Sequence, residues 1–202
     1  MTQLTEMQVD YIQEMFNTGL GDAAVELSEL VNEEVLISVP KFDLLTRDEL
    51  IKQLGIAPEA EVTTVTVGLA GDLGGNGMLI FPTGRSLDLV RSIVGETTSA
   101  DGLTELEAEV LTEVASIILN QIISTIASLL SVNVRTELPV SDQETLKSAL
   151  YRDAEAETVM FVGMSFAVQE LNLRGDILFL QTNEMVEKFI AEVARVLEEL
   201  GF

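Results

Sequence analysis

The chain has 202 residues, with 11 Lys and Arg against 34 Asp and Glu, and a formal net charge of -23. Such an acidic chain repels phosphodiesters and holds no basic run, which argues against nucleic-acid binding. It contains neither cysteine nor histidine. That composition excludes thiolate chemistry, metal sites built on Cys or His, and nucleophiles activated by histidine. Any catalysis must rest on carboxylates, amides, hydroxyls, Lys or Arg, or on chemistry that a partner supplies.

The N-terminal residues lack the basic and then apolar segments of a signal peptide, so a cytoplasmic location is expected. An uncharged stretch over 114–134 is long enough to cross a bilayer. Polar residues recur along it at Ser116, Asn120, Ser124, Ser128 and Ser131. This polar stripe favours a buried helix of a water-soluble fold over a membrane span, so no membrane partner is expected.

The first half of the chain opens with a helical pattern. Apolar residues follow the i, i+3, i+4 period over 4–32, which predicts one long helix, or two helices joined near Gly19 and Gly21. An apolar strand is expected at 34–39. Pro40 is expected to end this strand, because proline cannot donate a hydrogen bond to a sheet.

A short helix is predicted to follow. Thr46 and Glu49 have the spacing of a capping box and open this helix, which runs to about Leu54. The remaining elements expected in this half are a strand over 61–71, a hairpin turn at 74–77, a strand over 78–81 and a helix over 84–95. The turn is placed at 74–77 because Asn-Gly tolerates positive φ angles.

The second half repeats this order of elements. It is expected to contain a helix over 103–131, a strand over 132–138 that stops at Pro139, a short helix over 142–150, strands near 157–169 and 175–181 joined around 172–174, and a last helix over 183–200. Glu113 lies 99 positions after Glu14, and Pro139 lies 99 positions after Pro40. Matches at one offset indicate an internal duplication.

The predicted fold class is therefore α+β, in one domain that spans residues 1–202. Its two pseudo-symmetric repeats cover about 1–97 and about 98–202, and each reads helix, strand, helix, strand, strand, helix. They are expected to share one core and one antiparallel sheet covered by long helices, because no linker composition separates them. A monomer is expected, since the duplicated halves already mimic a two-fold dimer.

A polar stripe lies on the first long helix. Asp10, Glu14 and Asn17 stand at i, i+4 and i+7, so they project within roughly 60° of one another. The stripe continues to Gly21, where a partner could approach the backbone closely. The second long helix carries the corresponding residues Glu109, Glu113, Ser116 and Asn120. A single stripe of this kind is typical of any solvated helix face, but its recurrence with a proline at fixed distance favours a functional site.

Two spaced motifs carry a resemblance to the CheC/CheX/FliY family of chemotaxis phosphatases: Asp10-x3-Glu14-x2-Asn17-x22-Pro40 and the imperfect copy Glu109-x3-Glu113-x2-Ser116-x22-Pro139. Two copies in about 200 residues resemble the CheC branch of the family. The resemblance implies a phosphatase that hydrolyses the aspartyl phosphate of a CheY-type response regulator. It also implies binding to the deamidase CheD.

The same resemblance assigns roles to residues of the first stripe. It implies that Asn17 orients the attacking water, that Glu14 meets the active-site lysine of the partner, and that Asp10 contributes to docking. A carboxamide suits this task because it offers an acceptor and two donors without titrating. The regulator brings its own Mg²⁺, so neither a metal nor another cofactor of this chain's own is expected.

The second copy departs from the pattern at its most chemical position. Ser116 replaces the expected asparagine, and Asn120 lies one helical turn, about 5.4 Å, further along the axis. The second face is therefore expected to have weak activity, to serve only in docking, or to be inactive. Pro40 and Pro139 are expected to be structural. The alternative function is a non-catalytic adaptor that binds CheY, CheD or a motor-switch component.

Overall fold

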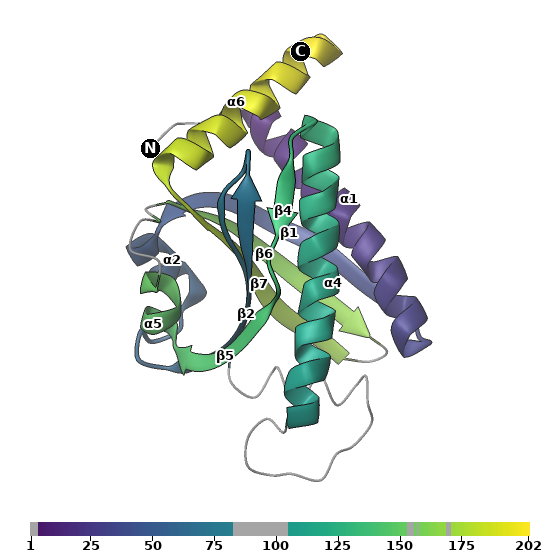
Figure 1. Ribbon diagram of the computed structural model, residues 1–202, viewed down its shortest axis with the longest axis vertical. Helices are drawn as coiled ribbons and strands as arrows, with labels where there is room; N and C mark the ends of the chain where they lie inside the picture. The colour runs from purple at the N-terminus through teal and green to yellow at the C-terminus, as the bar shows by residue number, and fades with distance from the viewer. Residues whose placement is uncertain (1–3, 83–104, 153–155, 157, 169–170) are drawn as a thin grey trace.

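The computed structural model describes residues 4–82, 105–152, 156, 158–168 and 171–202 (Figure 1). The helix expected over 84–95 and the boundary between the two repeats lie outside these residues. In chain order the elements are α1 (Glu6–Val31), β1 (Val35–Thr46), α2 (Arg47–Leu54), β2 (Glu61–Gly71), β3 (Gly75–Pro82), α4 (Glu105–Leu130), β4 (Val134–Thr136), β5 (Val140–Thr145), α5 (Leu146–Tyr151), β6 (Thr158–Val168), β7 (Leu171–Gln181) and α6 (Asn183–Leu200).

The described strands form one antiparallel sheet in the order β1-β6-β7-β3-β2-β4, and β5 also pairs with β2. The hairpins β2–β3 and β6–β7 occupy the centre of this sheet. Each edge is completed by the opposite half of the chain, because β1 pairs with β6 and β5 pairs with β2. The predicted α+β class, with an antiparallel sheet that both halves share, is confirmed.

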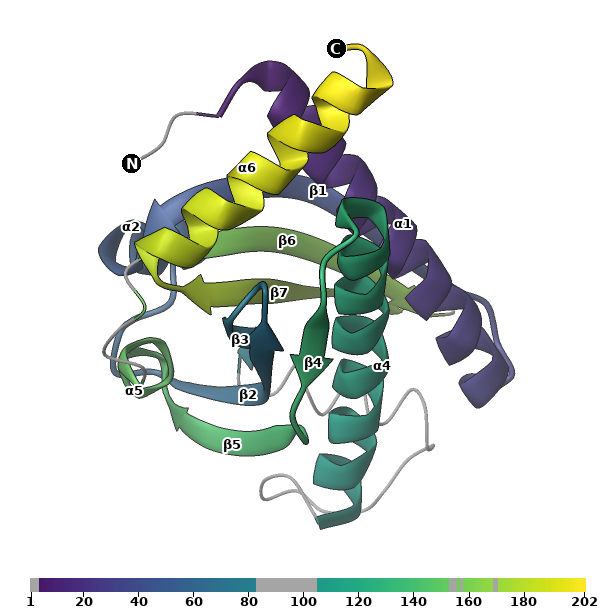
Figure 2. The same ribbon diagram turned by 45° about the horizontal axis from the view of Figure 1, so that its top comes forward.

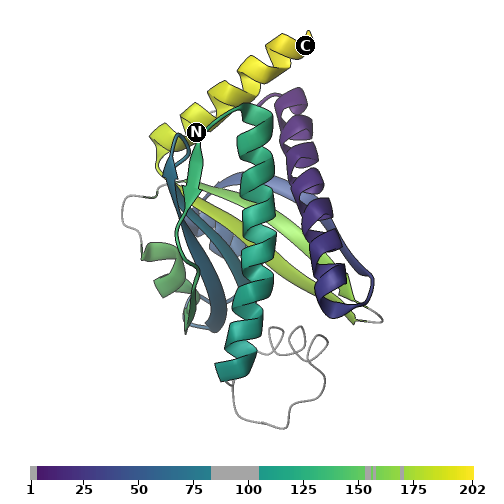
Figure 3. The same cartoon turned by 45° about the vertical axis from the view of Figure 1, so that its right-hand side comes forward.

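Helices cover both faces of the sheet. The long helices α1 and α4 lie side by side on one face (Figure 3), and α6 crosses near their ends (Figure 2). The short helices α2 and α5 lie on the other face (Figure 1). The larger core, which includes Phe16 of α1, lies between the sheet and the long helices. A smaller core around Leu50 of α2 lies beneath the short helices.

Helix α4 contains the apolar stretch noted in the sequence. Residues Ala108–Leu130 are long and apolar enough to cross a membrane by length and composition, and half of the most apolar window is buried inside the protein. Its buried residues, such as Ile118 and Ile122, belong to the larger core. Packing against α1 and the sheet accounts for the apolar face of this helix.

The duplication extends to the bounds of the elements. Helices α1 and α4 begin and end 99 positions apart, and β1 matches β4 and β5 together at the same offset. In both halves a threonine caps the next short helix: Thr46 accepts from the N–H of Glu49, and Thr145 accepts from that of Ser148. The predicted capping box of Thr46 and Glu49 is confirmed.

Pro40 does not end β1, so that prediction was wrong. The strand continues to Thr46 through a register shift between Ser38 and Lys41. Proline is tolerated there because β1 is an edge strand and the shift forms a bulge. In the second half, β4 ends before Pro139 and the strand resumes as β5. The following helix consequently starts at Leu146 and not at 142, because residues 140–145 pair with β2.

Both hairpin turns lie elsewhere than predicted. The turn between β2 and β3 spans 72–74, flanked by Gly71 and Gly75 with φ angles of 112° and 119°. Residues 76–77, which were expected in this turn, pair with β2. Residues 172–174, expected in the second turn, pair with β6. In the first hairpin, glycines at the ends of the turn supply the positive φ angles that the Asn-Gly pair was expected to supply.

Helix α1 runs without interruption through Gly19 and Gly21, whose surroundings differ. A Cβ atom added at Gly19 would lie 2.8 Å from the Cα of Ile122 in α4. A Cβ atom added at Gly21 would have no heavy atom within 4 Å. Gly19 therefore allows the two long helices to approach each other backbone to backbone.

This contrast predicts opposite effects on stability. Gly21→Ala is expected to raise the free energy of unfolding by up to about 1 kcal/mol, because alanine is the better helix former. Gly19→Ala is expected to lower it by about 1–2 kcal/mol, because the added methyl group forces α1 and α4 apart. Urea unfolding measures both values. Stabilisation by both substitutions would contradict the close approach of the helices.

Candidate functional site

The first polar stripe lies on the outer surface of α1. Asp10, Glu14, Asn17 and Gly21 are all exposed. The opposite side of the helix is buried, with side chains such as Phe16 in the core. This burial fixes the rotation of α1, so that the stripe faces solvent and can meet another protein.

The side chain of Asn17 reaches the edge strand β1. The backbone N–H of Val39 donates a hydrogen bond to Asn17 Oδ1 at 3.3 Å. Val39 directly precedes Pro40, so this contact joins the two ends of the Asn-x22-Pro spacing. The amide keeps a second lone pair on its oxygen and two N–H donors. It is exposed, and it can still bind a water molecule.

Glu14 stands almost one turn before Asn17 on the same face. Its backbone carbonyl accepts a hydrogen bond from Thr18 Oγ1 at 2.9 Å. Its exposed carboxylate forms no hydrogen bond or ion pair with any residue that the structure describes. The stripe therefore presents an unpaired carboxylate next to an amide that the backbone holds.

The second stripe lies on α4 and differs at its centre. Glu109, Glu113 and Asn120 are exposed, whereas Ser116 is half-buried. The Ser116 hydroxyl donates to the backbone carbonyl of Thr112 at 2.5 Å. This bond to its own helix occupies the proton of the hydroxyl, so that Ser116 presents no free donor.

The second half also lacks the contact between helix and edge strand. Leu138, which directly precedes Pro139, takes the place that Val39 has in the first half, and it is 88% exposed. Within the described ranges, no hydrogen bond joins Leu138 to Ser116. The geometry that holds the Asn17 amide is therefore not reproduced.

The two stripes form separate faces. Helices α1 and α4 run antiparallel (Figure 3), so Asp10 and Glu109 lie toward opposite ends of the helix pair. Gln121 Nε2 donates to Glu26 Oε2 at 2.7 Å and links the two helices. The structure thus places the predicted site residues in two groups and does not combine them into one centre.

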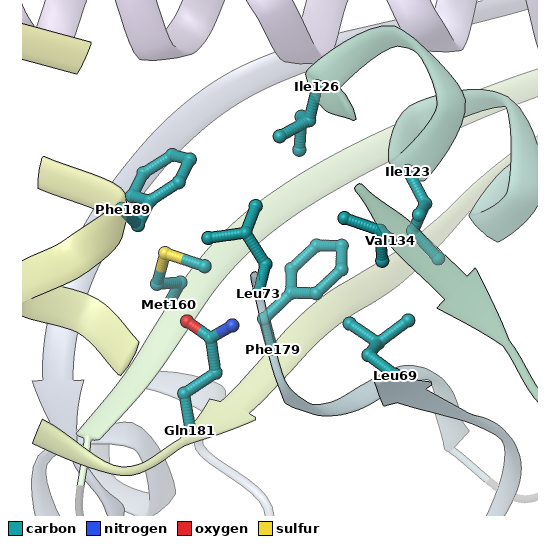
Figure 4. A pocket seen from close by; sticks show the side chains of 9 residues that line it. All are labelled: Leu69, Leu73, Ile123, Ile126, Val134, Met160, Phe179, Gln181 and Phe189. Atoms are coloured by element: carbon teal, nitrogen blue, oxygen red, sulfur yellow. The ribbon is translucent and has the colours of Figure 1, made fainter. Parts of the chain in front are cut away.

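A pocket in the larger core lies apart from both stripes (Figure 4). It is lined by Leu69, Leu73, Ile123, Ile126, Val134, Met160, Phe179, Gln181 and Phe189. Gln181 is its polar side chain, and Gln181 Nε2 donates to the carbonyl of Gly74 at 2.9 Å. None of the predicted site residues lines this pocket. Within the described residues, no group of three or more Asp or Glu side chains is arranged to hold a metal ion.

Sequence reasoning missed Val39. Its backbone N–H, and not its side chain, makes the contact with Asn17, so its residue type gave no indication. The signal available was its position directly before Pro40, at the end of the fixed spacing from Asn17.

No family model matches the chain. The CheY-P phosphatase CheC of Bacillus subtilis (strain 168) is 30% identical to it over 92 residues, which are 46% of this chain and 44% of that protein. The chain thus matches less than half the length of this curated relative.

Solved structures share the fold over nearly the whole chain. FliY of Thermotoga maritima is 17% identical with a TM-score of 0.73, and the match covers 96% of this chain and 100% of FliY. A chain of the FliG-FliM complex from H. pylori is 10% identical with a TM-score of 0.67, covering 93% and 100%. A chain of the CheX-CheY-BeF3-Mg+2 complex from Borrelia burgdorferi is 18% identical with a TM-score of 0.53, covering 87% and 99%.

At these identities the structural matches establish the fold, and the match to CheC adds a sequence relationship. The fold holds one motif copy on each of two long helices that pack side by side. Together these findings show that the chain shares the fold of FliY and is similar in sequence to CheC over 92 residues.

Proposed function

We propose that this protein hydrolyses the aspartyl phosphate of a CheY-type response regulator, with Asn17 and Glu14 at the reacting end. The observation that carries the proposal is an exposed amide, held by a backbone N–H, beside an exposed carboxylate on one helix face. The relationship to CheC, which is a CheY-P phosphatase, supports this class of substrate. We also propose that the protein acts as a monomer in the cytoplasm.

The chemistry fits the residues on this face. An aspartyl phosphate is an activated acyl phosphate, and the regulator's own Mg²⁺ and lysine neutralise the charge that develops. The phosphatase then has to hold one water in line with phosphorus. The Asn17 amide can accept a water proton at the free lone pair of Oδ1 or donate an N–H to the water oxygen. Each tenfold gain in rate requires only about 1.4 kcal/mol from such positioning.

Glu14 joins Asn17 at the reacting end and also contributes to docking, whereas Asp10 acts in docking alone. Glu14 lies almost one turn from Asn17 and is placed to pair with the lysine beside the partner's phosphorylated aspartate. This local pair opposes the repulsion between this acidic chain and an acidic partner, because salt screens charges further apart than roughly 8–10 Å. Asp10, one turn further along the stripe, extends the same contact.

The proposal is tested by following the decay of a phosphorylated receiver domain with and without this protein. Added in amounts well below the receiver concentration, the wild type is expected to accelerate decay with turnover. Binding to a receiver domain loaded with Mg²⁺ and beryllofluoride is measured in parallel. Unchanged decay together with binding would exclude a phosphatase and establish an adaptor.

The adaptor is the second candidate function. The half-buried Ser116 of the second face favours it for that face, because its hydroxyl is bonded to its own helix. The fold shared with a chain of the FliG-FliM complex also suits a role in assembly. In this alternative both helix faces dock CheY, CheD or a motor-switch component without hydrolysis.

Ser116→Asn tests whether the missing amide is what deprives the second face of activity. The substitution restores an amide three residues after Glu113 and 22 residues before Leu138. In the Asn17→Ala background, where the first face is silent, Ser116→Asn is expected to restore measurable decay of the phosphorylated receiver. Absence of any restored turnover would show that the second face serves only for docking.

A further inference from the structure

A backbone donor is directed out of the sheet beside the proposed site. Strand β1 pairs with β6 in one register up to Ser38. From Lys41 onward the pairing resumes with the register shifted by one residue. Val39 and Pro40 therefore oppose a single residue of β6, which is the arrangement of a β-bulge. Proline has no N–H. The N–H of Val39 donates to Asn17 Oδ1 on the neighbouring helix.

This hydrogen bond selects one orientation of the Asn17 amide. The terminal torsion of a free asparagine side chain is broad and roughly two-fold. The N–H of Val39 can only donate, so it requires the oxygen of the amide on its side and turns the NH₂ group away. A typical exposed hydrogen bond favours the bonded orientation by about two- to tenfold. The water site at Asn17 then has one defined arrangement of donors and acceptor.

The second half keeps the bulge and lacks the amide. Around Pro139 the register of β2 with β4 and β5 also shifts by one residue. Ser116 donates instead to the carbonyl of Thr112. The proline is therefore compatible with the fold in both halves, whereas among the described residues an amide receives the bulge N–H only in the first half. Pro139 is accordingly a matched control for Pro40.

We propose that Val39 and Pro40 are positioning residues for the hydrolysis of aspartyl phosphate. This inference rests on the proposed function and extends the site from α1 to the edge strand. Pro40 confines Val39 to extended backbone and keeps the register in which the N–H of Val39 faces Asn17. The Asn-x22-Pro spacing then joins the water-binding amide to the bulge that orients it.

The kinetic test compares Pro40→Ala with Pro139→Ala. Pro40→Ala is expected to lower kcat for the phosphorylated receiver by about two- to tenfold, because the amide loses its preferred orientation. The KM is expected to stay unchanged, since docking by Glu14 is intact. Pro139→Ala should alter neither constant. In the Asn17→Ala background, Pro40→Ala should have no further effect, since it acts only through that amide.

A second measurement detects the hydrogen bond without turnover. Exchange of the Val39 amide proton, followed by NMR, is expected to be slower in the wild type than in Asn17→Ala, and Pro40→Ala should also accelerate it. Equal exchange in the wild type and Asn17→Ala would overturn the inference. Wild-type turnover with an equal loss of kcat in Pro40→Ala and Pro139→Ala would overturn it while leaving the proposed function intact. A wild type without turnover overturns the proposed function, and with it the positioning role.

Discussion

Asn17→Ala is expected to reduce the accelerated decay of a phosphorylated receiver domain by about 100-fold, because a misplaced water loses that much of the rate. Binding to a receiver loaded with Mg²⁺ and beryllofluoride should change little, since Glu14 and Asp10 remain on the helix face. Stability should also change little, because the Asn17 side chain is exposed. A loss of kcat without a loss of binding or folding is the pattern expected for a residue that holds the attacking water.

Asn17→Asp is the sharper companion to the alanine variant. Aspartate keeps an oxygen that accepts the N–H of Val39, but it loses both amide donors and adds a negative charge. Activity close to wild type would show that the oxygen alone orients the water. Activity as low as that of Asn17→Ala would show that hydrolysis requires the NH₂ group or the absence of a negative charge at this position. Full turnover in both variants would refute the assignment of Asn17.

Phe16→Ala is expected to have the largest effect on stability, about 3–5 kcal/mol off the free energy of unfolding. Phe16 is fully buried, and its ring centroid lies 5.9 Å from that of Phe42 and 5.8 Å from that of Phe179. These three rings belong to α1, β1 and β7, so the cluster joins elements from both halves. Urea unfolding, monitored by circular dichroism, measures the loss.

Phe202→Ala is the matched control, because it makes the same replacement at the surface, where Phe202 is 72% exposed. It should change the free energy of unfolding by less than about 0.5 kcal/mol. If Phe16→Ala also lowered the free energy of unfolding by less than about 0.5 kcal/mol, the packing of α1 onto the sheet would be contradicted. Because Phe16 precedes Asn17, its burial also fixes the rotation that turns the polar stripe toward solvent.

Local sequence patterns predicted most of the helices and the order of the elements. The period of apolar residues located α1, and the capping box at Thr46 located the start of α2. The offset of 99 positions indicated a duplication, and α1 and α4 begin and end at this same offset. Each of these signals depends on residues within a few positions of one another, or on repetition, and both are visible in a sequence.

Errors arose where the outcome depends on neighbours distant in sequence. Proline usually predicts the end of a strand, but the strand that contains Pro40 lies at the edge of the sheet, where a bulge accommodates proline. The first hairpin turn was placed at 74–77, although the pairing of β2 with β3 fixes it at 72–74. Local turn propensity was outweighed by the register of the paired strands.

The candidate site also has one part that local sequence predicts and one part that depends on neighbours distant in sequence. The exposure of Glu14 and Asn17 on one helix face was predictable from spacing alone. The hydrogen bond from Val39 was not, because it requires α1 to pack beside β1 and the bulge to turn one N–H out of the ladder. The fixed sequence spacing between Asn17 and Pro40 was the one feature of the sequence that indicated this contact.

The crossed pairing of the halves has a further consequence. If two identical single repeats assembled in this way, every substitution would appear twice in the assembly, and both faces would have to change together. Here the exchange of strands is enclosed in one polypeptide, with β1 completing the second hairpin and β5 completing the first. Serine can therefore occupy position 116 while asparagine persists at position 17. Covalent linkage therefore allows the two helix faces to differ in sequence within one chain.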